Sequence, residues 1–412
     1  MLILKQGFQQ MLRPDPLMVH PDGDSLRALQ KAFGAVSEFF EVHGCSLSYV
    51  TNTGSGLCPL CKRHGFWLGG FSERSAYLII MVDWITPHPH GIYLPLADCW
   101  IDPSRAVKNA LVTHGHADHA RGGHESVWST PETLAIMKLR YGEAGTNIAM
   151  VYGDAVDIGG GITASWHPAG HVLGSAQILL ERAGERVVVT GDYKRRPDPT
   201  CALFEPVACD VLITEATFGL PIFTHPPIAG EIAKVIDALA ANPDRCVLVG
   251  AYALGKAQRV IAELRIAGHH DTIYLHGALA KMCELYTEHG VELGSLAPAA
   301  GMAKDALKGC IILAPPSALN DRWSRRLPDP ITAIASGWMR VRQRAVQRNV
   351  ELPLIISDHC DWTELTDTIR ELRPSETWIT HGREEALLHW CELHQMKARS
   401  LELVGREEDD EA

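Results

Sequence analysis

The chain has 412 residues, of which 46% are hydrophobic and 21% are charged, and its formal net charge is -11 at pH 7. This composition provides enough apolar material for two or three globular domains and excludes an intrinsically disordered chain. The negative balance excludes a global positive field for nucleic acid, so any polyanion must be held locally by basic residues or bound cations.

Cysteine usage and hydropathy indicate the compartment. The 11 cysteines are scattered without the spacing of a disulfide framework, and the first residues lack the features of a signal peptide. We therefore expect a cytoplasmic protein with reduced thiols. The apolar run 77–85 contains Asp83 and is far shorter than the roughly 20 residues that cross a bilayer, so we expect no membrane span.

The two ends of the chain differ from the middle in their residue patterns. Residues 1–80 form an extension of uncertain status, in which helical spacing of apolar residues across 24–43 predicts one amphipathic helix. Cys58 and Cys61 form a Cys-x-x-Cys pair near Cys45 and His64, but a zinc knuckle needs four well-spaced ligands, so reduced thiols are favoured. Residues 401–412 are rich in like charge and predict a solvated acidic tail.

From residue 84 onward, short β-type runs alternate with helical patterns. The predicted helices span 131–141, 228–241 and 255–267. The predicted strands lie in the stretches GIYLPLADCWID, NALVTHG, GITASWHP, AQILLE, RVVVTGD, DVLITEA, RCVLVGAY, DTIYLHG, GCIILAPP and LPLIISDH. Alternation of this kind predicts a layered α/β protein.

The stretch THGHADHA concentrates metal-binding side chains at the end of a predicted strand. His114 and His116 are two residues apart in extended chain and should point to the same side, whereas Asp118 and His119 follow on a turn and can face a second point. A lone histidine is usually structural, but this cluster indicates two neighbouring metal positions.

Two metals need more ligands, and further His and Asp residues follow other apolar runs. These candidates are His171 in a Gly-flanked turn, Asp192 after a Val-rich strand, His359 and His381. Each follows the carboxyl end of a predicted strand, where loops of α/β proteins converge to form active sites.

The ordered motifs resemble a known superfamily. HGHADH matches the HxHxDH signature of the metallo-β-lactamase superfamily, and Asp102, His171 and Asp192 match its other motifs in order. Glu215, His359 and His381 resemble motifs A, B and C of its β-CASP branch, whose members cut nucleic acid. Within the branch, stretches such as TEATFGLPIF and ASGWMRVR are most similar to bacterial ligase-associated DNA exonucleases.

The resemblance implies a fold and domain boundaries. A four-layer αββα metallo-β-lactamase sandwich would comprise 81–216 and 351–400, with an α/β β-CASP cap domain inserted at 217–350. The resembling proteins begin near Met81, so an over-extended start is the leading hypothesis for 1–80, although the helix at 24–43 favours a real appendage.

The resemblance also implies two divalent metal ions, zinc with manganese as a possibility. One would be bound by His114, His116, His171 and Asp192, and the other by Asp118, His119, Asp192 and His381, with Asp192 as the bridge. The implied catalytic set is Asp118, His359 as the general acid, Glu215 as its partner and Asp102 as the carboxylate that orients a ligand.

Substrate contacts are expected outside the ligand set. Arginines accumulate between 322 and 348, Trp338 offers a stacking surface, and Lys256 begins a predicted helix. The candidate substrate-binding residues are Lys194, Arg195, Lys256, Trp338, Arg340 and Ser357. A solvated basic face and an exposed helix lysine are the competing interpretations.

We therefore expect a phosphodiesterase that degrades DNA from an end, alongside an ATP-dependent DNA ligase and a helicase by family resemblance. The nearest alternative is a ribonuclease of the same branch, of an mRNA 3′-end processing type. A catalytically inactive nucleic-acid-binding scaffold is the alternative from another class.

Overall fold

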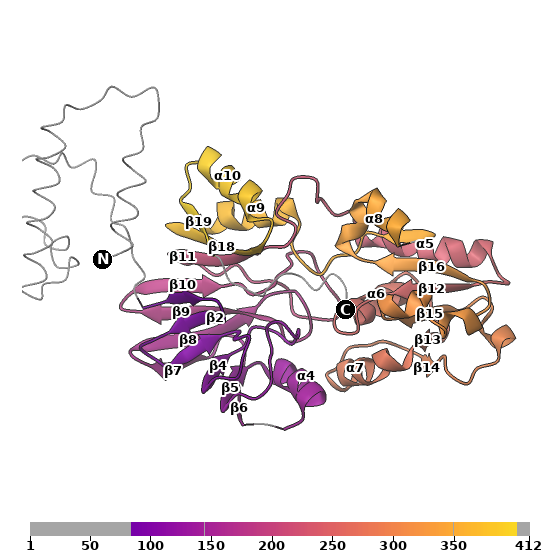
Figure 1. The fold of residues 1–412 in the computed structure, drawn as a ribbon, viewed down its shortest axis with the longest axis horizontal. Coiled ribbons are helices and arrows are strands. Elements are labelled where there is room, and N and C mark those ends of the chain that lie inside the picture. Colours follow the sequence, from indigo (N-terminus) through magenta and orange to yellow (C-terminus); the bar gives the residue numbers. More distant parts are fainter. Residues whose placement is uncertain (1–83, 144, 349, 402–412) are drawn as a thin grey trace, which may run out of the picture. The chain divides into compact units, whose positions relative to one another are not determined.

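The computed structural model describes residues 84–143, 145–348 and 350–401. The extension 1–80, with the helix expected at 24–43 and the Cys-x-x-Cys pair, lies outside the described residues, as does the acidic tail beyond residue 401. Within the described part, three sheets and their helices make a mixed α/β protein, which confirms the predicted class (Figure 1).

The first sheet has six strands in sequential order. Its first three strands pair antiparallel and its last four pair parallel. The strands are β1 (Thr86–His88), β2 (Gly91–Leu94), β3 (Cys99–Ile101), β4 (Asn109–Leu111), β5 (Ser126–Ser129) and β6 (Thr146–Ala149).

Helix α4 (Pro131–Tyr141) packs beside this sheet and has the bounds that the sequence predicts. The Thr130 hydroxyl caps the helix by accepting from the Thr133 amide at 3.2 Å, and proline occupies the first turn, where its missing N–H is tolerated. Gly142 ends the helix in a positive-φ conformation, and its amide donates to the Lys138 carbonyl.

The second sheet has seven strands in the order β19-β18-β11-β10-β9-β8-β7. Strands β10, β11, β18 and β19 are parallel, and β7 to β10 form an antiparallel meander. The strands are β7 (Ala155–Gly159), β8 (Ile162–Pro168), β9 (Ala176–Arg182), β10 (Glu185–Val189), β11 (Val211–Ala216), β18 (Glu376–Gly382) and β19 (Ala398–Ser400).

Helices α9 (Trp362–Leu372) and α10 (Glu384–Leu393) cover one side of this sheet (Figure 1). Leu365 and Ile369 of α9 and Leu387 of α10 pack with strand residues such as Val188 and Ile379. Burying one such side chain contributes about 1.5–3 kcal/mol. This core holds β10, β11 and β18 in place, and their carboxyl ends lead to candidate site residues.

The third sheet is parallel throughout, in the order β14-β13-β15-β12-β16-β17. Its strands are β12 (Cys246–Gly250), β13 (Ile273–Leu275), β14 (Leu296–Pro298), β15 (Ile311–Ala314), β16 (Pro330–Ala335) and β17 (Leu352–Leu354). Because β17 pairs with β16, this sheet extends beyond residue 350, where the resemblance placed the end of the inserted segment.

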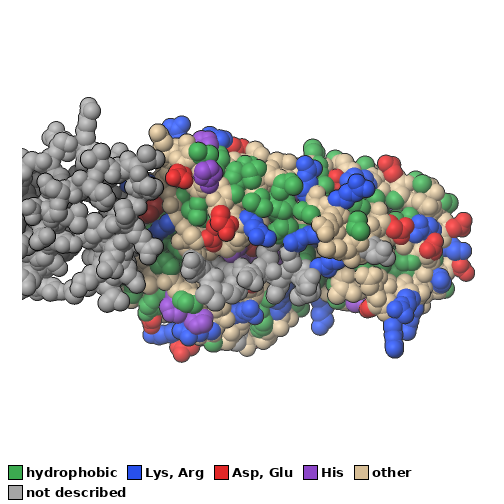
Figure 2. Space-filling view, turned by 45° about the horizontal axis from the view of Figure 1, so that its top comes forward, with side chains coloured by type: hydrophobic (Ala, Val, Ile, Leu, Met, Phe, Trp, Pro, Cys, Tyr) green, Lys and Arg blue, Asp and Glu red, His purple; other side chains and the backbone are tan. Residues whose placement is uncertain are grey.

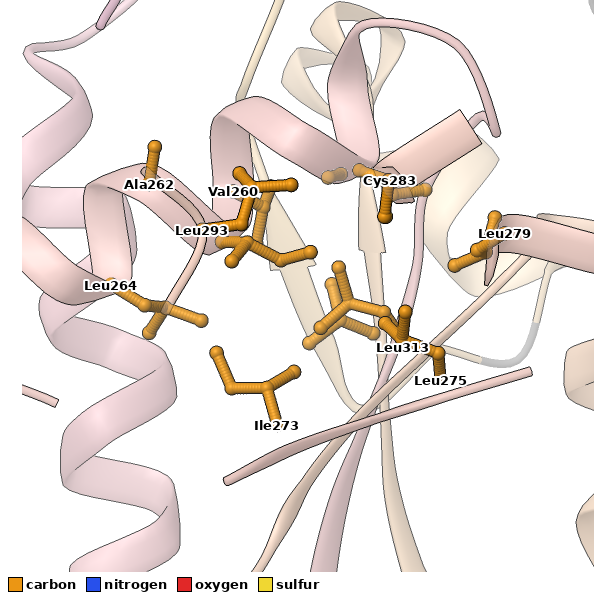
Figure 3. Close-up of a cluster of buried hydrophobic side chains, with 14 of the residues drawn as sticks. Val260, Ala262, Leu264, Ile273, Leu275, Leu279, Cys283, Leu293 and Leu313 are labelled. Carbon is orange, nitrogen blue, oxygen red and sulfur yellow. The ribbon is translucent and has the colours of Figure 1, made fainter. Parts of the chain in front are cut away.

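Helices flank the third sheet on both faces (Figure 1). They are α5 (Ile228–Ala241), α6 (Lys256–Ile266), α7 (Gly277–Glu288) and α8 (Arg342–Gln347), with short 3-10 turns at Lys304–Leu307, Pro316–Asn320, Ser324–Arg326 and Gly337–Arg340. Figure 3 shows Val260 and Leu264 of α6 and Leu279 and Cys283 of α7 packed toward Leu313 and its neighbours. Helix α5 has the predicted bounds, and α6 lies within one residue of them at each end.

The third-sheet core continues into the first part of the chain. Ile136 of α4 and Leu173 belong to the same buried cluster as the α6 and α7 side chains, and the Leu173 amide donates to the Tyr286 hydroxyl at 3.2 Å. Among the described residues, no helix combines the length and apolar character that crossing a bilayer requires.

Candidate metal centre and pocket

The HGHADH stretch follows β4 and turns at once. The amides of His119 and Ala120 both donate to the His116 carbonyl, at 3.2 and 2.8 Å, which closes a turn directly after the strand. His114 is fully buried and its Nε2 lies 3.1 Å from His116 Nδ1. The two imidazoles therefore converge, as their spacing predicts.

One carboxylate oxygen of Asp192 faces a first cluster of histidines. His171 Nε2 lies 2.9 Å from His116 Nδ1, and Asp192 Oδ2 lies 3.3 Å from His114 Nε2 and 3.6 Å from His171 Nε2. The four side chains can present one ligand atom each within 4.8 Å of one another. The structure thus brings together the whole set predicted for one metal, from segments after β4, β8 and β10.

The other oxygen of Asp192 faces a second cluster. Asp192 Oδ1 lies 3.1 Å from His381 Nε2 and 3.5 Å from His119 Nε2, and Asp118 Oδ2 lies 3.3 Å from the same nitrogen of His119. All members of the second predicted set therefore converge. Asp192 stands between the two clusters.

Strand β18 reaches this point through an irregular end. His381 has a φ of 30°, which is uncommon for a residue with a side chain, and the β11–β18 register shifts between Glu215 and Ala216. Gly382 also has positive φ, and a Cβ there would lie 2.2 Å from the Ala216 carbonyl oxygen. Glycine at position 382 therefore permits the close approach that turns His381 toward Asp192.

The outer nitrogens of His171 and His116 each face a carbonyl oxygen that sets the tautomer of the ring. His171 Nδ1 lies 2.8 Å from the Asp358 carbonyl, and His116 Nε2 lies 3.4 Å from the Leu254 carbonyl. Because a carbonyl only accepts, these nitrogens carry the proton and the inner nitrogens keep the lone pair. The lone pairs of the first cluster therefore point at one another.

Asp102 sets the tautomer of His119 in the second cluster. It is 1% exposed, accepts from the Thr113 amide at 2.8 Å and hydroxyl at 2.6 Å, and faces His119 Nδ1 at 2.8 Å. The Thr113 hydroxyl in turn lies 3.0 Å from His114 Nδ1, which must donate because that hydroxyl proton goes to Asp102. Asp102 therefore orients residues of both clusters, the role that the resemblance implies for it.

Burial and neighbouring charges determine the protonation of these groups. Burial lowers the pKa of His114, and it lowers the pKa of His116 to about 3 and that of His171 well below its usual range. Burial also disfavours charged His119, but the Asp192 and Asp118 carboxylates outweigh it and raise the His119 pKa. Neutral imidazoles in the first cluster are in the form that binds metal.

The donor set fits divalent metal ions. His119 Nε2 is buried without a hydrogen-bond partner among the described residues. The carbonyls that face His171 Nδ1 and His116 Nε2 leave the inner nitrogens of these two rings without a proton. Converging lone pairs and carboxylate oxygens repel one another unless a cation lies between them. Imidazole and carboxylate ligands suit Zn²⁺ and are also compatible with Mn²⁺.

His359 and Glu215 form a pair beside the clusters. His359 Nδ1 lies 3.0 Å from Glu215 Oε2, the Glu215 side chain is fully buried, and its other oxygen accepts from the Tyr193 amide at 2.8 Å. The His359 ring centroid lies 4.7 Å from that of His171. The structure thus places the predicted proton donor and its partner next to the first cluster.

A pocket of about 360 Å³ opens over the two clusters. Asp118, Asp192, His359 and His381 contribute to its lining, together with Lys256 and Trp338. The sequence analysis missed Arg140 of α4, Tyr252 and Phe218, which also line it. Arg140 follows an apolar helix pattern far from any motif, and only the fold brings it to the His116 side of the pocket.

Four other predicted substrate-binding residues are absent from the described lining of this pocket. Lys194 is fully buried and binds Asp198 at 2.6 Å, and Arg195 binds Glu371. Arg340 is exposed at the end of a 3-10 turn, and Ser357 is buried with its hydroxyl 3.0 Å from the His359 amide. Position in sequence next to Asp192 or His359 was therefore not a guide to contact with the pocket.

Comparison with known proteins supports a common origin with several nucleic-acid enzymes. A probable DNA ligase from Opitutus terrae is 28% identical over 322 residues, which cover 75% of this chain and 31% of that protein. Endoribonuclease YSH1 from Mycosarcoma maydis is 32% identical over 222 residues, covering 43% and 25%. Cleavage and polyadenylation specificity factor subunit 3 from Dictyostelium discoideum is 27% identical over 274 residues, covering 54% and 35%.

No protein-family model matches the chain. A crystal structure of a protein of unknown function from Enterococcus faecalis V583 aligns with a TM-score of 0.47 and 14% identity, covering 66% of this chain and 74% of the other. The chain spans between 25% and 35% of the length of the three relatives above. These relatives are consistent with the resemblance of the ordered motifs to the β-CASP branch of the metallo-β-lactamase superfamily.

Proposed function

We propose that the chain is a two-metal phosphodiesterase that acts as a DNA exonuclease. The observation that carries the proposal is the position of Asp192, whose two oxygens face separate His-rich clusters at 3.1–3.6 Å. A bridging carboxylate of this kind is what a pair of closely spaced metal ions requires. Zinc is the preferred metal, and manganese is compatible with the same ligands.

We infer that the fold has the finer organisation implied by the resemblance. The first and second sheets, with α4, α9 and α10, would form the αββα sandwich, and the third sheet with its helices would form the cap. The extents of the sheets support boundaries near 217 and 354 for the cap.

Bound between these clusters, two divalent ions would polarise a phosphodiester and make a water molecule nucleophilic at neutral pH. The chain supplies the other functions. Asp102 and the Asp358 carbonyl hold His119 and His171 with their Nε2 lone pairs directed inward. The walls formed by Leu254 and Phe218 limit water around the reacting phosphate.

Proton delivery to the leaving oxygen falls to His359. Glu215 accepts from His359 Nδ1 and stabilises the protonated imidazole, so that a proton on Nε2 can be donated in the pocket. Glu215 is itself held by the Tyr193 amide, which keeps its carboxylate directed at His359.

Arg140 would bind substrate phosphates and Trp338 would stack on a base, since both line the pocket. Lys256 also lines it, but its ammonium is buried against Asp358. Figure 2 shows acidic and basic side chains interspersed on the described part of the viewed face, so nucleic acid would have to be held at a local site. The DNA ligase relative supports DNA as the substrate, and the proposed role beside a ligase and a helicase in repair rests on the family resemblance.

The experiment uses the purified chain loaded with Mn²⁺ or Zn²⁺ and matched DNA and RNA strands labelled at either end. We expect stepwise loss of nucleotides from one end of DNA, little action on circular DNA, and loss of activity in His116→Ala/Asp118→Ala. His389→Ala, which changes an exposed imidazole on α10, is the matched control and should retain activity.

A β-CASP ribonuclease is the second candidate because YSH1 and the polyadenylation factor subunit are among the relatives. Faster cleavage of RNA than of DNA would establish it and overturn the DNA assignment. Equal degradation by the parent and the double variant would mean that the clusters do not perform the reaction. Tight binding of nucleic acid without cleavage under any metal would favour an inactive scaffold.

A further inference from the structure

The segment 355–361 joins the third sheet to the second and carries His359 near its middle. It is bound by side chains from both sides. Three hydrogen bonds join it to helices of the third sheet. The Ile355 amide donates to Glu231 Oε2 (2.8 Å), Lys256 Nζ donates to the Ile356 carbonyl (3.4 Å), and Arg259 Nη1 donates to the Ser357 carbonyl (2.6 Å). Three more contacts join it to the part of the chain before residue 200. His171 Nδ1 lies 2.8 Å from the Asp358 carbonyl, Arg196 Nη2 donates to the His359 carbonyl (3.0 Å), and the Cys360 amide donates to the Tyr193 carbonyl (2.7 Å).

Arg259 occupies the centre of a buried charge network. Its Nε lies 3.3 Å from Asp198 Oδ2, and its Nη1 lies 3.2 Å from Asp358 Oδ1. Lys194 binds Asp198, and Lys256 binds Asp358 at 3.2 Å. These five side chains are at most 8% exposed, so each charge depends on its partners rather than on water.

Helix α6 also lies close to the turn that holds His171. Its N-cap, Gly255, has positive φ, and a Cβ there would lie 2.4 Å from Val172 Cγ1. Arg259 is one turn into this helix. Movement of α6 would therefore disturb the backbone on both sides of the first cluster.

We propose that Arg259 is a positioning residue for the metal centre, an inference that rests on the proposed two-metal function. By holding the Ser357 carbonyl and the Asp358 carboxylate, Arg259 fixes segment 355–361. The Asp358 carbonyl then directs the His171 lone pair, and the next residue, His359, is held beside Glu215. A residue of the third-sheet helices thereby controls a ligand and a proton donor without touching either.

The geometry requires a guanidinium. One planar group hydrogen-bonds both Asp358 and the Ser357 carbonyl with Nη1 while its Nε side forms an ion pair with Asp198 at 3.3 Å. A lysine ammonium is a single point on a flexible stem and cannot make this set of contacts. Arg259 is absent from the described lining of the pocket, so its removal should leave substrate affinity nearly unchanged.

The test compares the parent with Arg259→Lys and Arg259→Met. Arg265→Met is the matched control, because Arg265 lies on the same helix but binds carbonyls of 269, 271, 293 and 295. Zn²⁺ affinity is measured by competition with a chelator, at a temperature well below unfolding. We expect both Arg259 variants to bind one zinc equivalent at least tenfold more weakly, with kcat lowered similarly and KM within about threefold of the parent.

Unchanged zinc affinity and kcat in both Arg259 variants would overturn the proposal, and so would an equal effect in the Arg265 control. A variant that loses thermal stability but keeps its zinc affinity would show a merely structural role. If the methionine variant does not fold, the zinc affinity and kcat of the lysine variant alone test the proposal. A parent chain that cleaves no nucleic acid would refute the proposed function, yet the zinc titration would still test the positioning of His171.

Discussion

Asp102→Asn is the substitution whose effect can be worked out most fully from the geometry. An asparagine keeps the shape of the side chain and one acceptor oxygen for the Thr113 amide. At the other position an amide nitrogen replaces Oδ2, which faces the Thr113 hydroxyl at 2.6 Å and His119 Nδ1 at 2.8 Å. The hydroxyl can rotate and accept, but the His119 N–H then faces another donor.

His119 can respond in two ways, and both weaken the second cluster. If Nδ1 keeps its proton, a buried charge-assisted hydrogen bond is lost, at a cost of about 1.5–3 kcal/mol. If the proton moves to Nε2, the lone pair directed at Asp118 and Asp192 disappears. Since about 1.4 kcal/mol is tenfold in an equilibrium constant, we expect metal affinity at this cluster to fall roughly 10- to 100-fold.

The assay is Zn²⁺ competition with a chelator, followed by metal analysis after dialysis. Asp102→Asn should lose the equivalent at the second cluster and, because the Thr113 hydroxyl that faces His114 Nδ1 loses its acceptor, should also hold the first less firmly. Its metal-free form should unfold at lower urea concentration. Asp154→Asn, which changes an exposed carboxylate, is the control and should match the parent. Two equivalents held as tightly as in the parent would mean that Asp102 does not orient the ligand histidines.

Three further predictions concern proton donation, stacking and pH. His359→Gln should lower kcat about 10²- to 10⁴-fold with unchanged metal content, and loss of metal would contradict its place outside the ligand set. Trp338→Ala should weaken binding of single strands by about 1–3 kcal/mol in a fluorescence anisotropy titration, and unchanged affinity would remove Trp338 from the substrate path. Burial and nearby Arg196 lower the pKa of His225 to about 3. The unfolded chain therefore binds one more proton between pH 3 and 6.5, so stability of the metal-free protein should fall as pH drops through this window. In urea unfolding, the free energy of unfolding of His225→Gln should fall less steeply with decreasing pH than that of the parent, and an identical dependence on pH would contradict the burial of a neutral His225.

Amphipathic helices and the residues that begin and end them could be predicted from the sequence. Helix α4 has threonine before it, proline in its first turn and glycine after it, and its observed bounds match the prediction. Other elements have weaker patterns. Helix α9 begins with a capping box between Asp361 and Glu364, a signature visible in the sequence that was not used.

The position of some site residues could be predicted from the sequence, and that of others could not. The metal-ligating types follow strands, and the parallel strands β10, β11 and β18 deliver Asp192, Glu215 and His381 to one edge, so their convergence was predictable. Lys194 and Arg140 were not. A lysine two residues after Asp192 became buried against Asp198, whereas an arginine on a distant helix came to the pocket.

Some predictions lie beyond the described residues or the present comparisons. The helix expected at 24–43 and the acidic tail fall outside the described part. The cytoplasmic location and the link with a ligase and a helicase stay predictions.

In the metal-loaded protein, Asp192 would be a ligand of both ions. The most direct measurement is electron paramagnetic resonance of the Mn²⁺-loaded chain, combined with its metal content. We expect two equivalents and a spectrum of exchange-coupled ions, which Asp192→Ala should convert to that of isolated ions or abolish. A single equivalent, or two ions without magnetic coupling in the parent chain, would contradict it.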